Sequence, residues 1–379
     1  GSQTYKLSEW NPFADEAASW FDPEWMFGVT EGFDVVIGNP PYGADYPAEH
    51  KKYFQSHYES AKTISGKQKG SIDTFSLFID KGFNLANYNS VLTYIVPMAI
   101  ASSDSMTALH NMMFRMCETI YVSTYSNRPK KIFDNADQRV AIISCQKNGK
   151  PTKNLFTTKV NKRYEDTSVQ KVIDGLQYVN SFSFVKYGRI PKVGTDIELS
   201  ILDKIYKSKT TLSNLFDEKG KPVYYRSSGG RYYNIVTNFL TGSTKEKPVL
   251  VKPEYRNLIA ALLSSNLYFW FYHIYSNNLD LKSYELEMFP IPIEDFNKES
   301  FATIEDIYKA YLKDLHKNSK IKKVSYAHVS EYREYYARHS KFLIDKIDLA
   351  IKDAYGLTNE EIQFIIKYDL KFRTDNEEE

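Results

Sequence analysis

A short apolar run that stops at two prolines most constrains the fold of this chain. Residues 33–38 (FDVVIG) are rich in β-branched and aromatic side chains, and Asn39-Pro40-Pro41 follows directly. Proline cannot donate a hydrogen bond to a sheet, so the predicted strand must end there. Further along, the apolar spacing predicts helices over 72–88 and 105–116 and strands over 90–97, 119–124 and 139–145. This alternation predicts an α/β fold in which βαβ units build a layered sheet.

After about residue 185 the pattern changes. An aromatic strand pair is expected at 224–236 (YYRSSGGRYYNIV), where a Ser/Gly-rich turn interrupts it, and an apolar helix is expected near 255–275. Helices are then predicted over 301–319, 328–354 and 358–368, and Thr358 with Glu361 fits a capping box at the start of the last one. We therefore expect three parts: 1–185, a mixed α+β part over 186–300, and a helical part over 301–379.

Composition and length exclude several classes of protein. With 379 residues, 42% of them apolar and 15% aromatic, the chain is too rich in core-forming side chains to be disordered. Its two cysteines, Cys117 and Cys145, exclude a disulfide scaffold and indicate buried, reduced thiols of a cytosolic protein. The apolar run over 258–274 is short for a bilayer span, so no membrane partner is expected. Gly1-Ser2 resembles a cloning remnant, and the missing initiator Met indicates a fragment of a longer protein.

Charge is unevenly distributed along the chain. Residues 1–60 hold ten acids and three bases, whereas residues 125–192 hold fourteen bases and five acids. Residues 201–285 hold twelve bases and seven acids, although the net charge of the whole chain is only +2. A basic middle favours a polyanionic partner such as nucleic acid, while solvated surface lysines remain an alternative interpretation.

The segment Asn39-Pro40-Pro41-Tyr42 carries the clearest chemistry. An exocyclic amine on an aromatic ring is a poor nucleophile because its lone pair is delocalised, and two acceptor oxygens at its hydrogens favour the reactive geometry. The Asn39 side-chain oxygen and the Pro40 carbonyl supply two such acceptors, and the fixed φ of the prolines preorganises them. Tyr42 offers a flat face for an extruded base. Alternatively, the segment is a Pro-Pro turn after a strand, with Tyr42 as ordinary packing.

The sequence resembles a known family at these residues. Residues 33–42 (FDVVIGNPPY) are similar to the catalytic motif of N6-adenine-specific DNA methyltransferases, in particular those of type IIG restriction–modification and phage-defence systems. The resemblance continues through short segments, singly less specific, that lie at 73–80, 91–97, 133–144, 262–292 and 354–368. It implies a partial Rossmann-like methyltransferase sheet over 1–185, a DNA target-recognition domain over 186–300 and C-terminal helices of the recognition region over 301–379.

The resemblance also implies roles for individual residues. Asn39, Pro40, Pro41 and Tyr42 would form the catalytic loop that holds the target adenine. Phe133 would stack on the other face of the base, with a place in the core as the alternative. Asp73 would support the cofactor pocket, with a simple charge at a helix start as the alternative.

The cofactor half of the family pattern is missing. Members of the family carry a Gly-rich S-adenosylmethionine loop upstream of the catalytic motif, but only 38 residues precede Asn39, and they contain no strand followed by a Gly-rich turn. The implied cofactor is S-adenosylmethionine, at a site that is incomplete in this chain. We therefore expect weak or no binding of the cofactor and no methylation by this chain alone, and a missing N-terminal portion of the parent protein is an expected partner.

Double-stranded DNA is the other expected partner. The best candidate for contacting it is the turn at 224–233, where Arg226 and Arg231 flank Ser and Gly residues and one of the tyrosines, Tyr232, is available. Alternatively, this turn is merely solvent-exposed. Further candidates for phosphate contacts are Lys130, Lys131, Arg139 and Lys282.

Metal-ligand spacings are not found among the histidines, and Asp217-Glu218-Lys219 lies in a polar turn that does not suit a nuclease. The sequence thus favours a site-specific DNA adenine methyltransferase of a restriction–modification or phage-defence system, located in the cytoplasm. Two alternatives remain open: a DNA-binding specificity module that is inactive without its missing half, and a methyltransferase that acts on RNA or on a protein amide.

Overall fold

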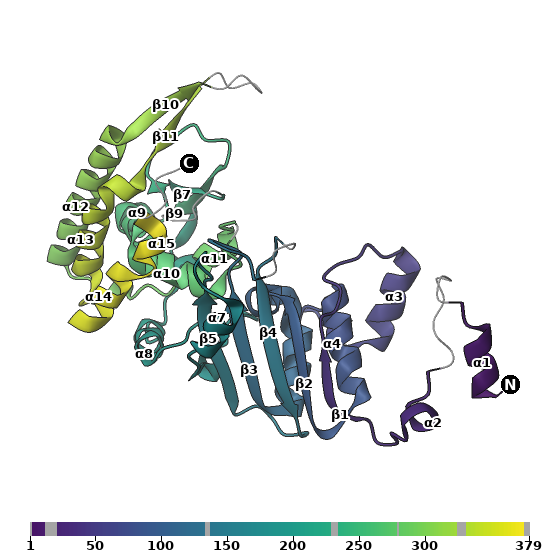
Figure 1. Cartoon of the computed structure of the whole chain (residues 1–379). Helices are drawn as coiled ribbons and strands as arrows, with labels where there is room; N and C mark the ends of the chain where they lie inside the picture. The colour runs from purple at the N-terminus through teal and green to yellow at the C-terminus, as the bar shows by residue number, and fades with distance from the viewer. Residues whose placement is uncertain are drawn as a thin grey trace. The chain divides into compact units, whose positions relative to one another are not determined.

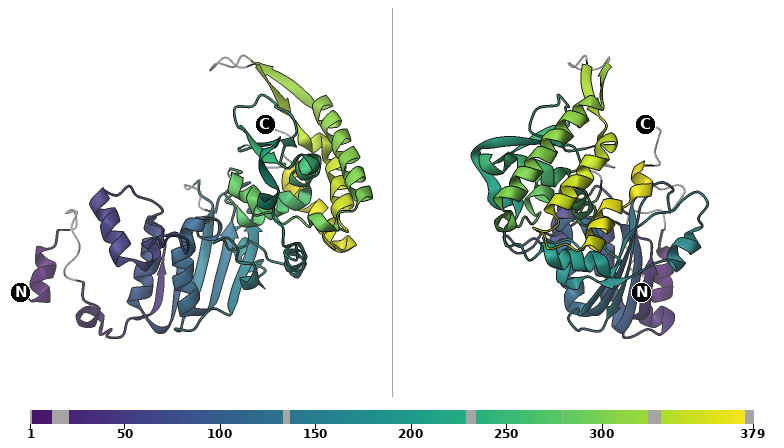
Figure 2. Two further views of the ribbon diagram at one scale, coloured as in Figure 1. Left: turned by 180° about the vertical axis from the view of Figure 1, so that it is seen from behind. Right: turned by 90° about the vertical axis from the view of Figure 1, so that its left-hand side faces the viewer.

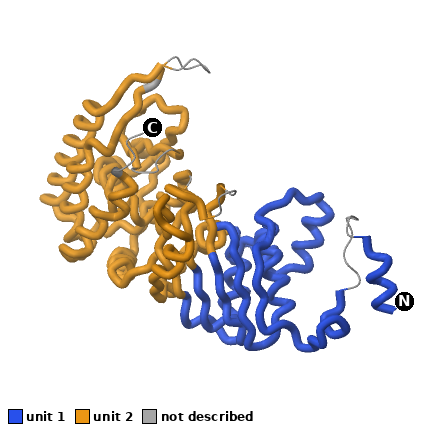
Figure 3. Tube along the Cα trace, in the orientation of Figure 1, with its two compact units in different colours: residues 1–97, 105–122, 142–155 blue, residues 98–104, 123–141, 156–379 orange. Residues whose placement is uncertain are grey.

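The chain adopts an α/β fold with a mixed sheet, as the sequence predicts (Figure 1). The computed structural model describes residues 2–11, 21–132, 137–228, 234–278, 280–323 and 331–374. These residues form two compact units, one made of residues 1–97, 105–122 and 142–155 and the other of residues 98–104, 123–141 and 156–379 (Figure 3). We call them unit 1 and unit 2 and describe each by itself.

A six-stranded sheet has the strand order β1-β2-β4-β3-β5-β6. Strands β1 and β2 pair in parallel within unit 1, and β5 and β6 pair antiparallel within unit 2. The strands are β1 (Phe33–Gly38), β2 (Ala86–Pro97), β3 (Cys117–Tyr125), β4 (Val140–Lys147), β5 (Asn154–Asn161) and β6 (Val179–Asn180). The predicted strands are thus present, and β2 begins four residues earlier than expected because its first residues extend the pairing with β1, from Phe33 opposite Ala86 onward.

Unit 1 packs helices against β1 and β2. Its largest helix, α4, buries eight of twelve residues, because Phe75, Ile79 and Phe83 recur at the spacing that forms one helix face. Both cysteines are buried and unpaired in this unit, as expected. Its helices are α1 (Gln3–Glu9), α2 (Pro23–Phe27), α3 (Ala48–His57), α4 (Thr74–Leu85) and α6 (Thr107–Met116).

Unit 2 is built around α10 (Asn266–Tyr275), whose ten residues are all buried. Helices α12 and α13 run beside one another in the same unit (Figure 2). A three-stranded sheet, β8-β7-β9, and the antiparallel pair β10–β11 complete it. The other helices are α5 (Ala99–Ser102), α7 (Val169–Asp174), α8 (Asp196–Ile205), α9 (Arg256–Ser264), α11 (Ser283–Glu287), α12 (Lys298–Lys317), α13 (Lys341–Ile351), α14 (Asn359–Lys367) and α15 (Leu370–Thr374), and the strands are β7 (Phe216–Arg226), β8 (Val236–Thr237), β9 (Glu246–Val251), β10 (Ser319–Lys323) and β11 (Glu331–Tyr335).

Two predicted helices of unit 2 need correction. The single helix expected near 255–275 is two helices, because Ser265 is extended and its side chain accepts a hydrogen bond from the Tyr268 N–H, which begins α10. The helix expected over 328–354 begins only at Lys341, because residues 331–335 pair with β10 as strand β11. The capping box predicted at Thr358 and Glu361 is confirmed at the start of α14.

Buried titratable side chains bond to the two ends of α10. Asp348 accepts hydrogen bonds from the backbone N–H groups of Asn266 (3.1 Å) and Leu267 (3.0 Å) at its first turn. At its last turn, the Lys192 ammonium donates to the carbonyl oxygens of Ile274 (2.9 Å) and Ser276 (2.6 Å). An anion at the N-terminus and a cation at the C-terminus both complement the helix dipole.

A pH-dependent stability follows from Lys192. Burial lowers its pKa from 10.5 to about 7, so between these values the unfolded chain binds a proton that the folded chain lacks. Stability should therefore rise as pH increases from about 7 to 10.5, by at most about 1.4 kcal/mol per pH unit, and Lys192→Met should abolish this rise.

The measurement is urea unfolding at several pH values, followed by the fluorescence of Trp270 in a background with Trp10, Trp20 and Trp25 changed to Phe. Trp270 lies in α10 and is then the sole tryptophan. The exposed Lys309 provides the control Lys309→Met, which should keep the rise. If the free energy of unfolding changes with pH in the same way in Lys192→Met and in the unsubstituted protein, the pKa of Lys192 is not lowered by folding.

Candidate functional site

The segment 39–42 follows β1 in unit 1. Asn39 is exposed, Pro40 is buried and Tyr42 is half-buried, so the loop is anchored at Pro40 while the Asn39 side chain meets solvent. Glycine suits position 38 at the end of the strand, because a Cβ there would lie only 3.0 Å from the ring of Tyr94, its partner in β2. The close approach of β1 to Tyr94 thus sets where the loop leaves the sheet.

The hydroxyl groups of two tyrosines in this region differ in their contacts. The Tyr46 hydroxyl bonds to Thr74 Oγ1 at 2.7 Å, which ties the segment after the loop to the start of α4. The Tyr42 hydroxyl is buried and has no hydrogen-bond partner among the described residues, and burial raises the pKa of this phenol. The hydroxyl therefore stays protonated at neutral pH.

Asp73, the candidate for the cofactor pocket, immediately precedes α4. Its carboxylate accepts a hydrogen bond from Ser71 Oγ at 2.9 Å, and it makes no capping bond to the helix. The side chain is exposed. Asp73 and the segment 39–42 both belong to unit 1, whereas the described candidates for DNA contacts belong to unit 2.

Three basic candidates for DNA contacts are already engaged. Lys130 pairs with Glu165 at 2.8 Å, and Lys131 lies 3.9 Å from Asp137. The Arg139 guanidinium donates to the Asn277 carbonyl at 2.6 Å. Ion pairs at this level of exposure are worth about 0–1 kcal/mol, so phosphates can replace these acids at low cost.

The remaining candidates differ in their surroundings. Arg226 ends β7, which pairs antiparallel with β8 as the sequence predicts, and its Nε is buried with no hydrogen-bond partner among the described residues. Lys282 is exposed just before α11, and its ammonium lies 5.9 Å from the centre of the Tyr284 ring. Phe133, Arg231 and Tyr232 lie outside the described residues.

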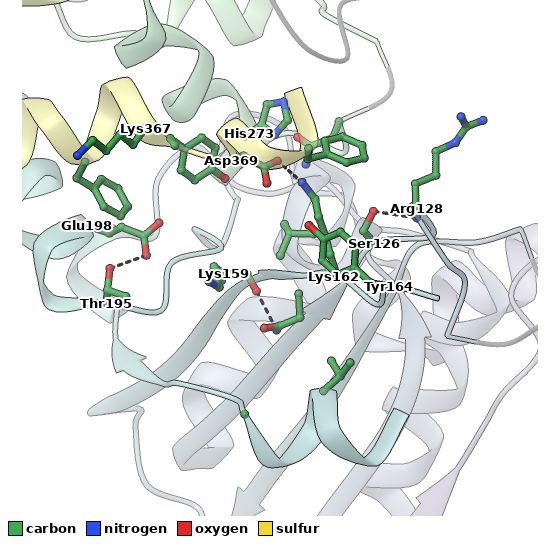
Figure 4. A pocket seen from close by; sticks show the side chains of 18 of the residues that line it. Ser126, Arg128, Lys159, Lys162, Tyr164, Thr195, Glu198, His273, Lys367 and Asp369 are labelled. Atoms are coloured by element: carbon green, nitrogen blue, oxygen red, sulfur yellow. Dashed lines mark hydrogen bonds and ion pairs between the residues drawn. The ribbon is translucent and has the colours of Figure 1, made fainter. Parts of the chain in front are cut away.

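Unit 2 contains a cavity of about 930 Å³ that the sequence did not reveal (Figure 4). The basic segment 125–192 gave a signal for it, but nothing in the sequence showed which of its cations converge. The lining combines basic, acidic and aromatic side chains with His273 of α10. Its charged members are Arg128, Arg139, Lys159, Lys162, Lys171, Lys367, Glu198, Glu360 and Asp369.

Two buried titratable groups line this cavity. Glu198 accepts hydrogen bonds from the Gly194 N–H and Thr195 Oγ1, both at 2.9 Å, and burial raises its pKa. Burial also lowers the pKa of His273 well below its usual value, so the imidazole is neutral, and its Nε2 has no partner among the described residues. No group of three potential metal ligands occurs in the described ranges, and none of the helices there is long and apolar enough to cross a membrane.

The first third of the chain is similar to known proteins. Residues 3–133 match the family described as Eco57I restriction-modification methylase. A type II methyltransferase of Thermus thermophilus is 26% identical over 144 residues, which are 34% of this chain and 31% of that protein. The chain thus spans about a third of the curated relative that it matches.

Solved structures of restriction–modification enzymes are also similar. The DrdV–DNA complex has a TM-score of 0.32 at 14% identity, over 53% of this chain and 23% of that one. The ATP-dependent type ISP enzyme LlaBIII bound to DNA has a TM-score of 0.36 at 12% identity, over 89% of this chain and 22% of that one. The type IIG restriction endonuclease BpuSI has a TM-score of 0.33 at 10% identity, over 88% of this chain and 54% of that one.

The unpartnered hydroxyl of Tyr42 gives a stability prediction for this region. Tyr42→Phe removes a buried polar group that has no partner among the described residues, so it should raise the free energy of unfolding by about 1 kcal/mol. The matched control is Tyr46→Phe, which breaks a hydrogen bond and should lower it by about the same amount. The free energy of unfolding of both variants is measured by urea unfolding. An equal decrease in the two variants would show that the Tyr42 hydroxyl has a hydrogen-bond partner.

The expected resemblance is therefore confirmed over the first third of the chain: residues 3–133, which include Asn39-Pro40-Pro41-Tyr42, match the family described as Eco57I restriction-modification methylase.

Proposed function

We propose that the chain is part of a site-specific DNA methyltransferase that transfers a methyl group from S-adenosylmethionine to N6 of a flipped adenine, in a restriction–modification or phage-defence system of the cytoplasm. The observation that carries the proposal is the placement of Asn39. This residue directly follows β1 and is exposed, whereas the next residue, Pro40, is buried. The match of residues 3–133 to a restriction-modification methylase supports the reaction class.

The proposed roles follow from the groups in the segment 39–42. The Asn39 side-chain oxygen and the Pro40 carbonyl accept hydrogen bonds from the exocyclic amine, which favours its pyramidal, nucleophilic form. Pro41 fixes the backbone, and the ring of Tyr42 stacks on the extruded base. The amine becomes cationic before it loses a proton, so this step needs no strong general base.

The described residues do not complete a site for S-adenosylmethionine. Ahead of Asn39, the described residues 2–11 and 21–38 form α1, α2 and β1, with no earlier strand that leads into a Gly-rich turn. Asp73 is the one acidic candidate of this chain, and its exposed carboxylate is bonded only to Ser71 among the described residues. No step through the cofactor is derived from this chain, and we propose that the chain alone is inactive.

The uncovered side of β1 supports a further partner that supplies the cofactor half. β1 is an edge strand of the sheet, yet the Val35 and Ile37 side chains are 61% and 77% exposed. Strands of parallel sheets are ordinarily buried on both faces, and long apolar edges invite pairing. We propose that the N-terminal portion of the parent protein covers this edge.

Double-stranded DNA is the proposed substrate. In this proposal residues 1–185 belong to the catalytic domain, residues 186–300 to the target-recognition domain and residues 301–379 to its helical part. Arg226, Lys282, Lys130, Lys131 and Arg139 are proposed DNA contacts, together with Arg231, Tyr232 and the base-stacking Phe133. The incomplete cofactor site favours one alternative, a DNA-specificity module that performs no chemistry without its missing half.

Asn39→Ala tests the reaction. In cells that express the full parent reading frame, modification-sensitive sequencing should find N6-methyladenine at one defined motif, and Asn39→Ala should abolish it because one of the two amine acceptors is lost. The matched control is Asn111→Ala on α6, whose exposed amide bonds to Gln68 and which should leave methylation intact. Methylation that persists in Asn39→Ala would refute the assigned role, and its absence in both the unsubstituted protein and the control would favour the specificity module.

Cofactor binding by the chain alone is a separate prediction. Isothermal titration calorimetry with S-adenosylmethionine should detect no binding in the micromolar range, since the described residues ahead of Asn39 form no Gly-rich turn after a strand. The parent protein serves as the positive control and should bind. Micromolar binding by the isolated chain would refute the proposal of an incomplete site.

A further inference from the structure

The cavity of unit 2 is lined by six basic and three acidic side chains. Lys159 extends from the end of β5, Lys171 from α7 and Lys367 from α14, and Arg128 lies on the loop after β3. None of these four forms an ion pair with a carboxylate in the part of the chain that the structure describes. Two acids that share the cavity already have other partners, since Asp369 pairs with Lys162, and Gly194 and Thr195 hold Glu198 (Figure 4).

Apolar side chains also line the cavity, beside a buried histidine. Side chains of Val160, Val172, Ile197, Phe364 and Phe372 line it. His273 also lines it, is only 8% exposed and has a buried Nε2 with no hydrogen-bond partner among the described residues. A buried polar atom without a partner costs about 1–3 kcal/mol, so a ligand group that bonds to it gains that energy back.

We propose that this cavity binds a nucleoside phosphate. The phosphate lies beside Lys159 and Lys171, whose charges oppose its own, while Arg128 and Lys367 lie at opposite sides of the cavity (Figure 4). The base lies against the apolar wall and meets His273 Nε2 with a ring nitrogen or an exocyclic amine. The volume of about 930 Å³ falls within the range of sites that enclose small organic ligands.

The nucleoside phosphate has two possible sources, a free nucleotide and a nucleotide within a nucleic-acid strand. Both present the same phosphate and base to the cavity. All lining residues belong to unit 2, and none belongs to the segment 39–42. The test of this site therefore uses residues other than those proposed for methyl transfer and does not depend on that chemistry.

The test is calorimetric titration of the intact chain with adenosine diphosphate, adenosine, inorganic phosphate and a single-stranded dT 12-mer. We expect adenosine diphosphate to bind more tightly than adenosine or phosphate alone. The double variant Lys159→Gln/Lys171→Gln, which changes exposed side chains, should weaken this binding at least about tenfold, or 1.4 kcal/mol. The matched control Lys309→Gln/Lys346→Gln changes two exposed lysines of α12 and α13 and should bind as the unsubstituted chain does.

His273→Phe separates the two halves of the site. It should weaken binding of adenosine diphosphate and leave that of phosphate unchanged, because it removes the proposed contact to the base and keeps the cations. Mutual displacement of adenosine diphosphate and the 12-mer assigns the site to strand nucleotides, and binding of adenosine diphosphate without displacement assigns it to a free nucleotide. No binding of adenosine diphosphate at millimolar concentration, or equal affinity in the lysine double variant and its control, overturns the proposal.

Discussion

The fully buried helix α10 is held at both of its ends by hydrogen bonds to buried titratable side chains, and the rest of unit 2 depends on this arrangement. Taking Asp348 and Lys192 out of water is costly, and burial shifts the pKa of each to about 7. The backbone groups at the two helix ends repay this cost, because they would otherwise be buried without partners. These hydrogen bonds therefore permit a helix with every residue buried, and most of its aromatic side chains belong to the core of unit 2.

The same helix shapes the cavity. His273 reaches the lining from its third turn, and the Trp270 indole donates to Glu198 Oε1 at 3.3 Å, which helps to fix that buried carboxylate. Lys192 secures the turn at Ser276, just ahead of Asn278, which also lines the cavity. The placement of α10 thus couples the stability of unit 2 to the geometry of the proposed nucleotide site.

In unit 1 a different constraint positions the candidate chemistry. The absence of a side chain at Gly38 lets β1 approach Tyr94, and the two prolines then turn the chain out of the sheet. Pro40 is buried while Asn39 remains exposed, so a rigid scaffold presents a polar group to solvent. The exposed apolar side chains of Val35 and Ile37 on the same strand explain why this scaffold is proposed to need a partner.

Local patterns in the sequence determined β1, α4, the strand pair β7–β8 and the capping box at Thr358 and Glu361, since each rests on neighbouring residues alone. They also led to the segment 39–42 and to the family of residues 3–133. Only the tertiary structure decided the break at Ser265, where Asp348 reaches α10 from 82 residues away, and the pairing of β11 with β10. It likewise brought residues between Ser126 and Phe372 around one cavity, because convergence of side chains depends on long-range packing that no local periodicity encodes.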